Sequence, residues 1–171
     1  MKKELTLEEI QQIRRDPDKA DWYIISSDSD LSEEFIREFK DRVYWDYISN
    51  CQKLSEDFIR EFSDKVNWYY ISYYQKLSEK LIREFKDRIA WGHISKHQKL
   101  STSFIREFSD KLYWPYISKH QKLSEEFIYE FYDKVWWEIL CEKDYNFKDA
   151  PRHVRLYICL NHRYLLKFFN P

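Results

Sequence analysis

Large apolar residues recur along this chain in two short, alternating clusters that are separated by polar and charged residues. In the central part of the chain one cluster reads Phe-Ile-x-x-Phe over 58–62, and the next reads Val-x-Trp-x-x-Ile over 66–71. Spacings of three and four residues place apolar side chains on one face of a helix. The pattern therefore predicts two short amphipathic helices that alternate along the chain.

The first of these helices, which we call helix A, is predicted over about eight residues between Leu54 and Phe62. Ser55 is a natural N-cap, and the acidic residues after it fill the first turn, where the helix dipole favours negative charge. Phe58, Ile59 and Phe62 fall on one face.

The start of the second helix, helix B, is indicated by a proline in another copy of the pattern. Pro115 follows Trp114 directly. A helix capped by Asp110 would place this proline in its interior at a cost of about 3 kcal/mol, whereas a helix that begins at about Trp114 holds it in the first turn. Helix B is therefore expected to run from the Trp to the Lys before the next Leu-Ser, and Asp-Lys-Val is expected to be a tight connector.

Helices A and B together form a unit that repeats every 23 residues. A fixed period of this length is typical of a solenoid. Isolated helices of this size are marginal in water, so stacking of repeats must supply the stability, and we expect the tryptophan row to be buried between repeats. The expected fold is all-α, an α-solenoid of short two-helix repeats over 31–140. The repeat is marked by Trp22, Trp45, Trp68, Trp91, Trp114 and Trp137.

Both ends depart from the repeat, as the capping units of a solenoid do. Residues 1–30 keep the Leu-Thr cap and the connector to Trp22, with a few extra residues around Pro17, and we interpret them as a divergent N-terminal capping repeat. In the last unit Cys141 replaces the repeated Ser and Asp144 replaces the repeated Gln. Residues 141–171 then predict a helical cap with one longer helix. Its apolar residues are Val154, Ile158, Leu165 and Phe169.

Composition supports short helices and narrows the class of protein. The 171 residues include one Gly and four Pro, 35% are charged, 19% are aromatic, and the net charge is -1. Near-neutrality argues against a protein that coats nucleic acid, because such binding needs a strongly basic surface. No segment has a signal-peptide core or the roughly 18 apolar residues of a membrane span. We expect a cytoplasmic protein, and three cysteines without a framework pattern fit a reducing compartment.

Two sets of polar residues recur in every regular repeat, and each set has two interpretations. An arginine row accompanied by glutamates is either a site for phosphates and carboxylates or an Arg–Glu ladder that fixes the stacking register. Repeated Ser and Gln residues are either a polar recognition groove or internal hydrogen-bonding groups. The arginine row consists of Arg37, Arg60, Arg83 and Arg106. The other set begins with Ser49 and Gln52 and recurs at 72/75, 95/98 and 118/121.

The positions that vary between repeats are the better candidates for function, because packing does not dictate them. Around helix B they are rich in tyrosine and histidine, and tyrosine is enriched in protein interfaces. We interpret these residues as an interaction face for a protein partner of unknown identity. The alternative is that the rings are half-buried between repeats. The face comprises Tyr47, Tyr69, Tyr70, Tyr73, Tyr74, His93, His97, Tyr116 and His120.

Metal, nucleic-acid and catalytic functions have less in their favour. His93, His97 and His120 have a conceivable zinc or copper spacing, but no carboxylate or thiolate of the expected kind accompanies them, so we predict no metal and no cofactor. The basic C-terminal segment, with Arg152, Arg155, Arg163 and Lys167, suits nucleic acid or a membrane surface, or is the polar outer face of a cap. Nucleic acid is the less favoured partner. Glycine-rich phosphate loops, nucleophile elbows and His-Glu-x-x-His motifs are absent from the sequence, which argues against an enzyme.

The repeat Trp-x-x-Ile-Ser, Gln-Lys-Leu-Ser-Glu-x-Phe-Ile-Arg-Glu-Phe, Asp-Lys-Val resembles short tandem repeats in uncharacterised proteins of giant DNA viruses that infect amoebae and of some large phages. The resemblance covers about 18–140 and implies a viral repeat protein that acts inside the host. It brings no ligand or catalytic residue with it. The sequence thus favours a non-enzymatic, protein-binding repeat protein, monomeric or weakly self-associating. The alternative is a protein that sequesters a nucleotide or another small ligand through the arginine row.

Overall fold

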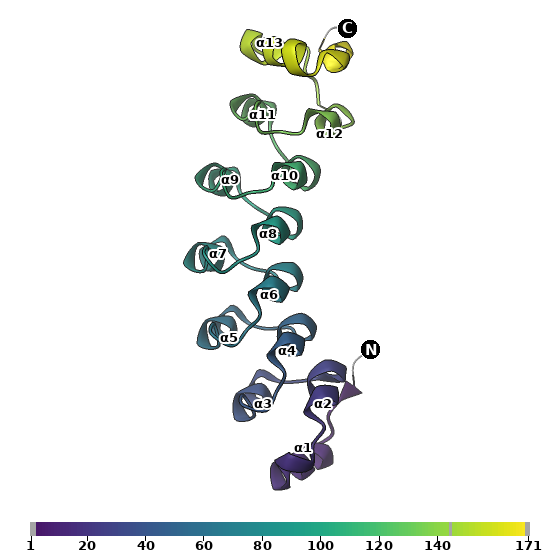
Figure 1. Cartoon of the computed structure of the whole chain (residues 1–171), viewed down its shortest axis with the longest axis vertical. Helices are drawn as coiled ribbons and strands as arrows, with labels where there is room; N and C mark the ends of the chain where they lie inside the picture. The colour runs from purple at the N-terminus through teal and green to yellow at the C-terminus, as the bar shows by residue number, and fades with distance from the viewer. Residues whose placement is uncertain (1–2, 144, 170–171) are drawn as a thin grey trace. The chain divides into compact units, whose positions relative to one another are not determined.

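The computed structural model describes residues 3–143 and 145–169, and its helices form two compact units. Unit 1 spans Met1–Ala90 and unit 2 spans Trp91–Pro171. In both units successive helix pairs pack on one another (Figure 1), which confirms the predicted all-α repeat solenoid. The strands within the described residues are two residues each, β1 (Lys3–Glu4) and β2 (Ser29–Asp30), and they pair in parallel.

Unit 1 contains a longer first helix followed by alternating B and A helices. The B helices α2, α4 and α6 pack side by side, and the A helices lie in a neighbouring column (Figure 1). The elements are α1 (Leu7–Arg15), the 3-10 helix η1 (Pro17–Lys19), α2 (Trp22–Asp28), α3 (Glu33–Glu38), α4 (Trp45–Cys51), α5 (Glu56–Glu61), α6 (Trp68–Tyr74) and α7 (Glu79–Glu84).

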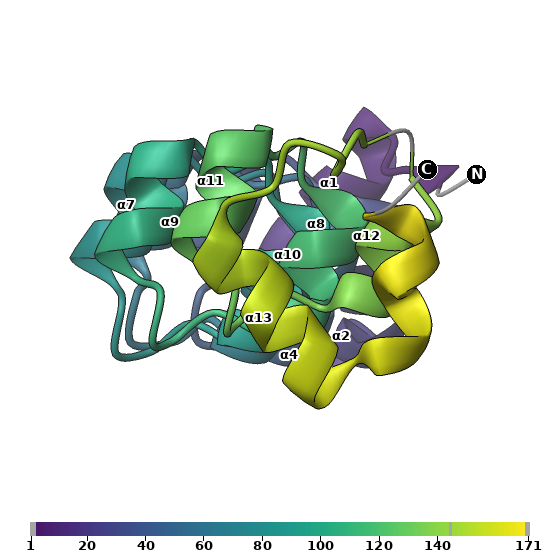
Figure 2. The ribbon, with the colours of Figure 1, turned by 90° about the horizontal axis from the view of Figure 1, so that it is seen from above.

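Unit 2 continues the alternation and adds a C-terminal cap. Its B helices α8, α10 and α12 pack in sequence, α13 lies at the end beyond α11, and the last element, η2, packs on α12 (Figures 1 and 2). Among the described residues, no helix has both the length and the apolar character that a membrane span requires. The elements are α8 (Trp91–His97), α9 (Thr102–Glu107), α10 (Trp114–His120), α11 (Glu125–Glu130), α12 (Trp137–Cys141), α13 (Arg152–Asn161) and the 3-10 helix η2 (Arg163–Phe168).

The predicted starts of both repeat helices are confirmed. The Ser55 hydroxyl accepts a hydrogen bond from the Phe58 amide at 3.2 Å and caps α5. Pro115 lies in the first turn of α10, where its missing N–H breaks no helical bond. Helix B ends earlier than expected, because α6 stops at Tyr74 and Gln75 is already extended.

The predicted apolar faces are buried, whereas the tryptophan row is buried only at one end. Ile59 is 1% exposed and Ile71 is fully buried. Trp68 is only half-buried, which corrects the expectation of a buried row: its ring packs 4.5 Å from Phe85 and the remainder is open to solvent. Trp22, Trp45 and Trp91 are likewise half-buried, whereas Trp114 and Trp137 are buried.

Repeated Ser and Gln side chains are internal hydrogen-bonding groups, as one of the two interpretations predicted. The fully buried Ser49 hydroxyl donates to the Trp45 carbonyl at 2.7 Å and accepts from the Asn67 amide at 2.9 Å. The Gln75 amide group donates to the Ser49 and Gln52 carbonyls at 3.2 and 2.7 Å. These bonds tie each helix B to the next repeat, so the Ser and Gln residues hold the stack rather than a ligand.

The N-terminal repeat diverges in α1 rather than around Pro17, which corrects the predicted position of the extra residues. Helix α1 has nine residues where α3 has six. Asp18 pairs with Arg42, the same 24-residue spacing at which Asp41 pairs with Lys65, so the connector around Pro17 has the regular length. The extra residues therefore lengthen α1 by about one turn.

The C-terminal cap is helical, but it is not one long helix. Helix α13 ends at Asn161, and η2 follows after His162. The four predicted apolar residues are all buried, and Phe147 and Phe169 cover the ring of Trp137 at 5.4 and 5.5 Å. The cap thus closes the last repeat with aromatic side chains.

Two residues around Asp144 take over the bonds that the repeated Gln makes elsewhere. The Lys143 ammonium donates to the Ser118 carbonyl at 2.5 Å, and the Tyr145 hydroxyl accepts from the Leu123 amide at 3.4 Å. Asp144, the predicted replacement for Gln, lies outside the described residues.

Candidate interaction surface

The outward side of the B helices is formed by positions that packing leaves free to vary. In a helix with 3.6 residues per turn, the first, fourth and fifth positions share one side, and the second, third, sixth and seventh share the other. In α6 the fourth and fifth residues, Ile71 and Ser72, are fully buried, whereas Tyr69 and Tyr74 on the opposite side are 56% and 53% exposed. We call these outward positions, with the residue before each B helix, the B surface of each unit.

All nine residues of the predicted interaction face lie on the B surfaces. None of them is buried: four are exposed and the others are half-buried. The exposed ones are Tyr69, Tyr74, His97 and His120. The half-buried ones are Tyr47, Tyr70, Tyr73, His93 and Tyr116.

The B surface of unit 1 is a cluster of tyrosine rings. Tyr23 of α2 meets Tyr47 of α4 edge-on, with ring centroids 5.0 Å apart, and Tyr73 and Tyr74 of α6 are 4.4 Å apart. A hydrogen bond with Tyr23 raises the pKa of Tyr47 to about 12. The cluster presents both apolar ring faces and hydroxyl groups on the outward side of the B helices.

The B surface of unit 2 carries histidine and lysine instead. The rings of His93 and His97 lie 6.0 Å apart on α8, and on α10 the ring of Tyr116 is 5.8 Å from that of His120. The Lys96 ammonium lies 5.6 Å above the ring of Tyr116, so the two helices touch through a cation–π contact.

Burial and neighbouring positive charge make these imidazoles poor bases. Desolvation is the main cause that lowers the pKa of His93 and of His97, and the Lys96 ammonium adds to it. For His120, desolvation is again first, followed by the charge of Lys119 and more distant lysines. The site is therefore a cationic patch whose histidines give up their protons readily.

No three His, Cys, Asp or Glu side chains are grouped closely enough to hold a metal ion within 3–143 and 145–169. His93, His97 and His120 accordingly do not form a three-ligand site in this structure.

Every guanidinium of the arginine row contacts a glutamate. The Arg37 Nε donates to Glu61 at 2.7 Å and the Arg60 Nε donates to Glu84 at 2.8 Å, in each case one repeat further on. These bonds are the first cause that raises the pKa of Arg37 and of Arg60. The Nε and Nη2 of Arg106, on one edge of the guanidinium group, donate to the Glu130 carboxylate at 2.9 and 2.8 Å, and Arg83 lies 3.5 Å from Glu79.

Sequence reasoning missed a second role of the acidic residue that opens helices α3 and α5. The Glu33 carboxylate accepts from the Ser55 amide at 2.6 Å, and Glu56 accepts from the Ser78 amide at 2.6 Å. Burial opposes ionisation of Glu56, but the Ser78 hydrogen bonds lower its pKa overall. The regular spacing of Glu and the next N-cap Ser was the available signal.

Arg155, one of the basic C-terminal residues, is hydrogen-bonded within the cap. The Arg155 guanidinium donates to the carbonyls of Ala150 and Lys148 at 2.8 and 2.7 Å. The exposed apolar residues of this segment, Leu156 and Leu160, face away from the buried side of α13.

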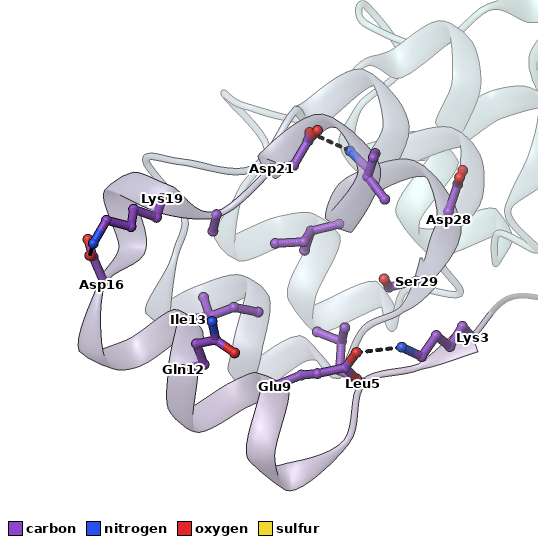
Figure 3. A pocket seen from close by; sticks show the side chains of 13 residues that line it. Lys3, Leu5, Glu9, Gln12, Ile13, Asp16, Lys19, Asp21, Asp28 and Ser29 are labelled. Atoms are coloured by element: carbon purple, nitrogen blue, oxygen red, sulfur yellow. Dashed lines mark hydrogen bonds and ion pairs between the residues drawn. The ribbon is translucent and has the colours of Figure 1, made fainter.

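A cleft of about 430 Å³, which the sequence did not predict, lies between α1 and α2 near the start of unit 1. Figure 3 shows Glu9 and Gln12 on the α1 side, and Asp21 and Asp28 on the α2 side. Lys3 is paired with Glu9, and Asp21 caps α2 by accepting from the Ile24 amide at 3.1 Å. The polar groups of the cleft are thus partly engaged in local structure.

The chain matches no protein-family model, and neither curated proteins nor solved structures give a significant match.

Proposed function

We propose that this chain is a non-enzymatic repeat protein that binds a protein partner through its B surfaces. The supporting observation is a division of labour within each repeat. Constant polar residues such as Ser49 and Gln75 are buried and bonded inside the stack, and the arginines contact glutamates. The variable residues of the B surfaces are the ones left on the outside.

The chemistry of these residues suits a protein interface. Tyrosine offers a large apolar ring and a hydroxyl at a small entropic cost, and a rigid helix holds it in place. Tyr69 and Tyr74 leave about half of their surfaces open to a partner. The resemblance to viral repeats extends the proposal to a host factor in the cytoplasm as the partner.

Sequestration of a nucleotide or other small ligand by the arginine row is the weaker alternative, because carboxylates already occupy the guanidinium groups of Arg37, Arg60 and Arg106. A nucleotide would have to displace an ion pair in each repeat. A rise in melting temperature with any nucleotide of a panel would support this alternative, and no rise would leave it without support.

Partner capture by the tagged chain, followed by quantitative mass spectrometry, tests the proposed function. The variant Tyr70→Ala, His93→Ala, Tyr116→Ala should lose the proteins that the wild-type chain enriches, with unchanged helicity. A matched variant on the A helices, Glu34→Ala, Asp57→Ala, Glu126→Ala, changes three exposed side chains and should retain them. Equal capture by both variants would contradict the proposal.

A further inference from the structure

The outward sides of α8 and α10 carry positive charge without any carboxylate. The two helices read Trp-Gly-His-Ile-Ser-Lys-His and Trp-Pro-Tyr-Ile-Ser-Lys-His, and they pack side by side. Lys96 and Lys119 occupy the same position of the repeat, and so do His97 and His120. Each of the two neighbouring helices therefore presents a Lys-His pair at the same position of the repeat.

The charged groups around this patch reinforce it. His93 is adjacent to His97 and Lys96, and His120 is within the field of Lys96, Lys119, His97 and Lys143. Lys143 is half-buried and bonded to the Ser118 carbonyl, so it contributes fixed charge rather than a contact. The nearest acidic positions of the next B helix are Glu138, which is bonded to Tyr164 and His162, and the exposed Glu142.

Aromatic rings border the cationic groups. Tyr113 before α10 is 51% exposed and Trp136 before α12 is 44% exposed. The ring of Tyr116 lies 4.9 Å from that of Tyr113 and is covered in part by Lys96. The patch therefore combines cations with flat apolar surfaces that an extended chain can pack against.

The spacing of the lysines sets the geometry of a ligand. Adjacent packed helices lie about 8–10 Å apart. An extended segment in the polyproline II conformation rises about 3.1 Å per residue with three residues per turn, so every third side chain points the same way at a distance of about 9 Å. Acidic side chains three residues apart in such a segment match the repeat of Lys96 and Lys119.

From the paired lysines, the absence of carboxylates on α8 and α10, and the bordering rings, we propose that the part of the unit 2 B surface formed by α8 and α10 binds an extended acidic protein segment. This inference rests on the proposed function and names the chemistry of the partner at one part of its surface. The histidines add a regulatory element. Bound carboxylates favour their protonated forms, and the pKa values of the free imidazoles are lowered from 6.5, so the affinity for the segment rises as the pH falls below about 6.5.

Fluorescence anisotropy with a labelled peptide of about fifteen residues, built from Glu-Pro-Ser triplets, tests the proposal. The wild-type chain should bind at low salt and more tightly at about pH 5.5 than at about pH 7.5. The variant Lys96→Glu, Lys119→Glu should bind about tenfold or more weakly. The variant Lys53→Glu, Lys80→Glu changes the net charge equally at exposed positions of unit 1 and should bind like wild type.

Several results would overturn the inference. Equal losses in the two charge-reversal variants would mean that only the net charge matters. Tighter binding to an oligothymidylate of similar length would assign the patch to nucleic acid. If Lys96→Glu, Lys119→Glu fails to fold by circular dichroism, Lys96→Gln, Lys119→Gln replaces it with the same expected direction. Absence of peptide binding, with partner capture still lost in the Tyr70, His93, Tyr116 variant, would overturn this inference and leave the proposed function standing.

Discussion

The B surfaces of the two units differ in nearly every outward side chain, although they are built on the same helix. In unit 1, α2, α4 and α6 contain tyrosines and the acidic residues Asp28 and Asp46, and no Lys, Arg or His. In unit 2, α8 and α10 contain Lys and His and no Asp or Glu. The helices have the same length of seven residues in all five cases.

The residues beneath these surfaces do not differ. Ile71 and Ser72 in α6 and Ile94 and Ser95 in α8 are all fully buried. Each serine hydroxyl bonds to the carbonyl of its tryptophan at 2.7 Å. The fold therefore does not require the difference on the outside, and binding is the simplest reason for one scaffold to display two kinds of surface.

The largest effect we predict concerns the shared interior. Ile71→Ala and Ile117→Ala each remove a fully buried side chain, and each should lower the free energy of unfolding by about 2–5 kcal/mol. Urea denaturation measures both. Similar losses are expected from the two units. A large decrease in the free energy of unfolding for one variant and none for the other would show that the buried isoleucine positions of the repeats are not equivalent.

The buried serines give the next largest effect. Ser72→Ala and Ser95→Ala remove the acceptor of the Ala90 and Tyr113 amides, which are held at 2.9 Å. An unsatisfied buried N–H costs about 1–3 kcal/mol. Both variants should melt earlier than wild type by similar amounts, and wild-type melting in either would contradict the internal role of the serine row.

A smaller, opposite effect is expected at Gly92, which stands where α6 has Tyr69. Nothing lies within 4 Å of a Cβ added at Gly92. Gly92→Ala should therefore stabilise the protein by about 0.4–1 kcal/mol, because alanine loses less conformational entropy in a helix. A loss of stability, measured by the same urea titration, would show that the open space beside α8 is needed.

The smallest effect concerns pH and separates the two surfaces. The pKa values of His97 and His120 are lowered in the folded chain, first by burial and then by lysine charges, from a usual value of 6.5. The folded state thus binds protons less readily than the unfolded chain, so stability is complete above about pH 6.5 and declines below it. Replacing both histidines with Gln should flatten the decline between about pH 7 and 5. An unchanged slope would show that other groups cause it.

Much of the fold was predictable because the repeat constrains it many times over. A single proline, Pro115, was enough to place the start of helix B, and Ser55 was enough to cap helix A. The burial of the tryptophans was harder to predict. The exposed fraction of Trp68 depends on how its ring packs on Phe85, and residue spacing alone does not reveal this. At the two ends the pattern is broken, and the predictions there were less accurate. The extra residues were expected around Pro17 but lengthen α1, and the single C-terminal helix that was expected is divided into α13 and η2.

The residues of the candidate surface could be predicted from the sequence, but the pairing of charged side chains and the cleft near the N-terminus could not. Variation between copies identified the outward residues of helix B, because packing fixes the others. Side-chain pairing was ambiguous in the sequence, and only the 24-residue offset between Arg37 and Glu61 shows that the arginine row is bonded between repeats. The cleft between α1 and α2 lies in the capping unit, where the repeat is broken, and the repeat pattern gave no sign of it.

Site-specific photocrosslinking in the source cells tests the central claim most directly. A photoreactive phenylalanine analogue is placed in turn at Tyr69 and Tyr116 on the B surfaces, and at Asp57 and Glu126 on the A helices. The account predicts adducts with the same partner from B-surface positions and none from the A helices. Adducts that form from Asp57 or Glu126 while Tyr69 and Tyr116 give none would contradict it.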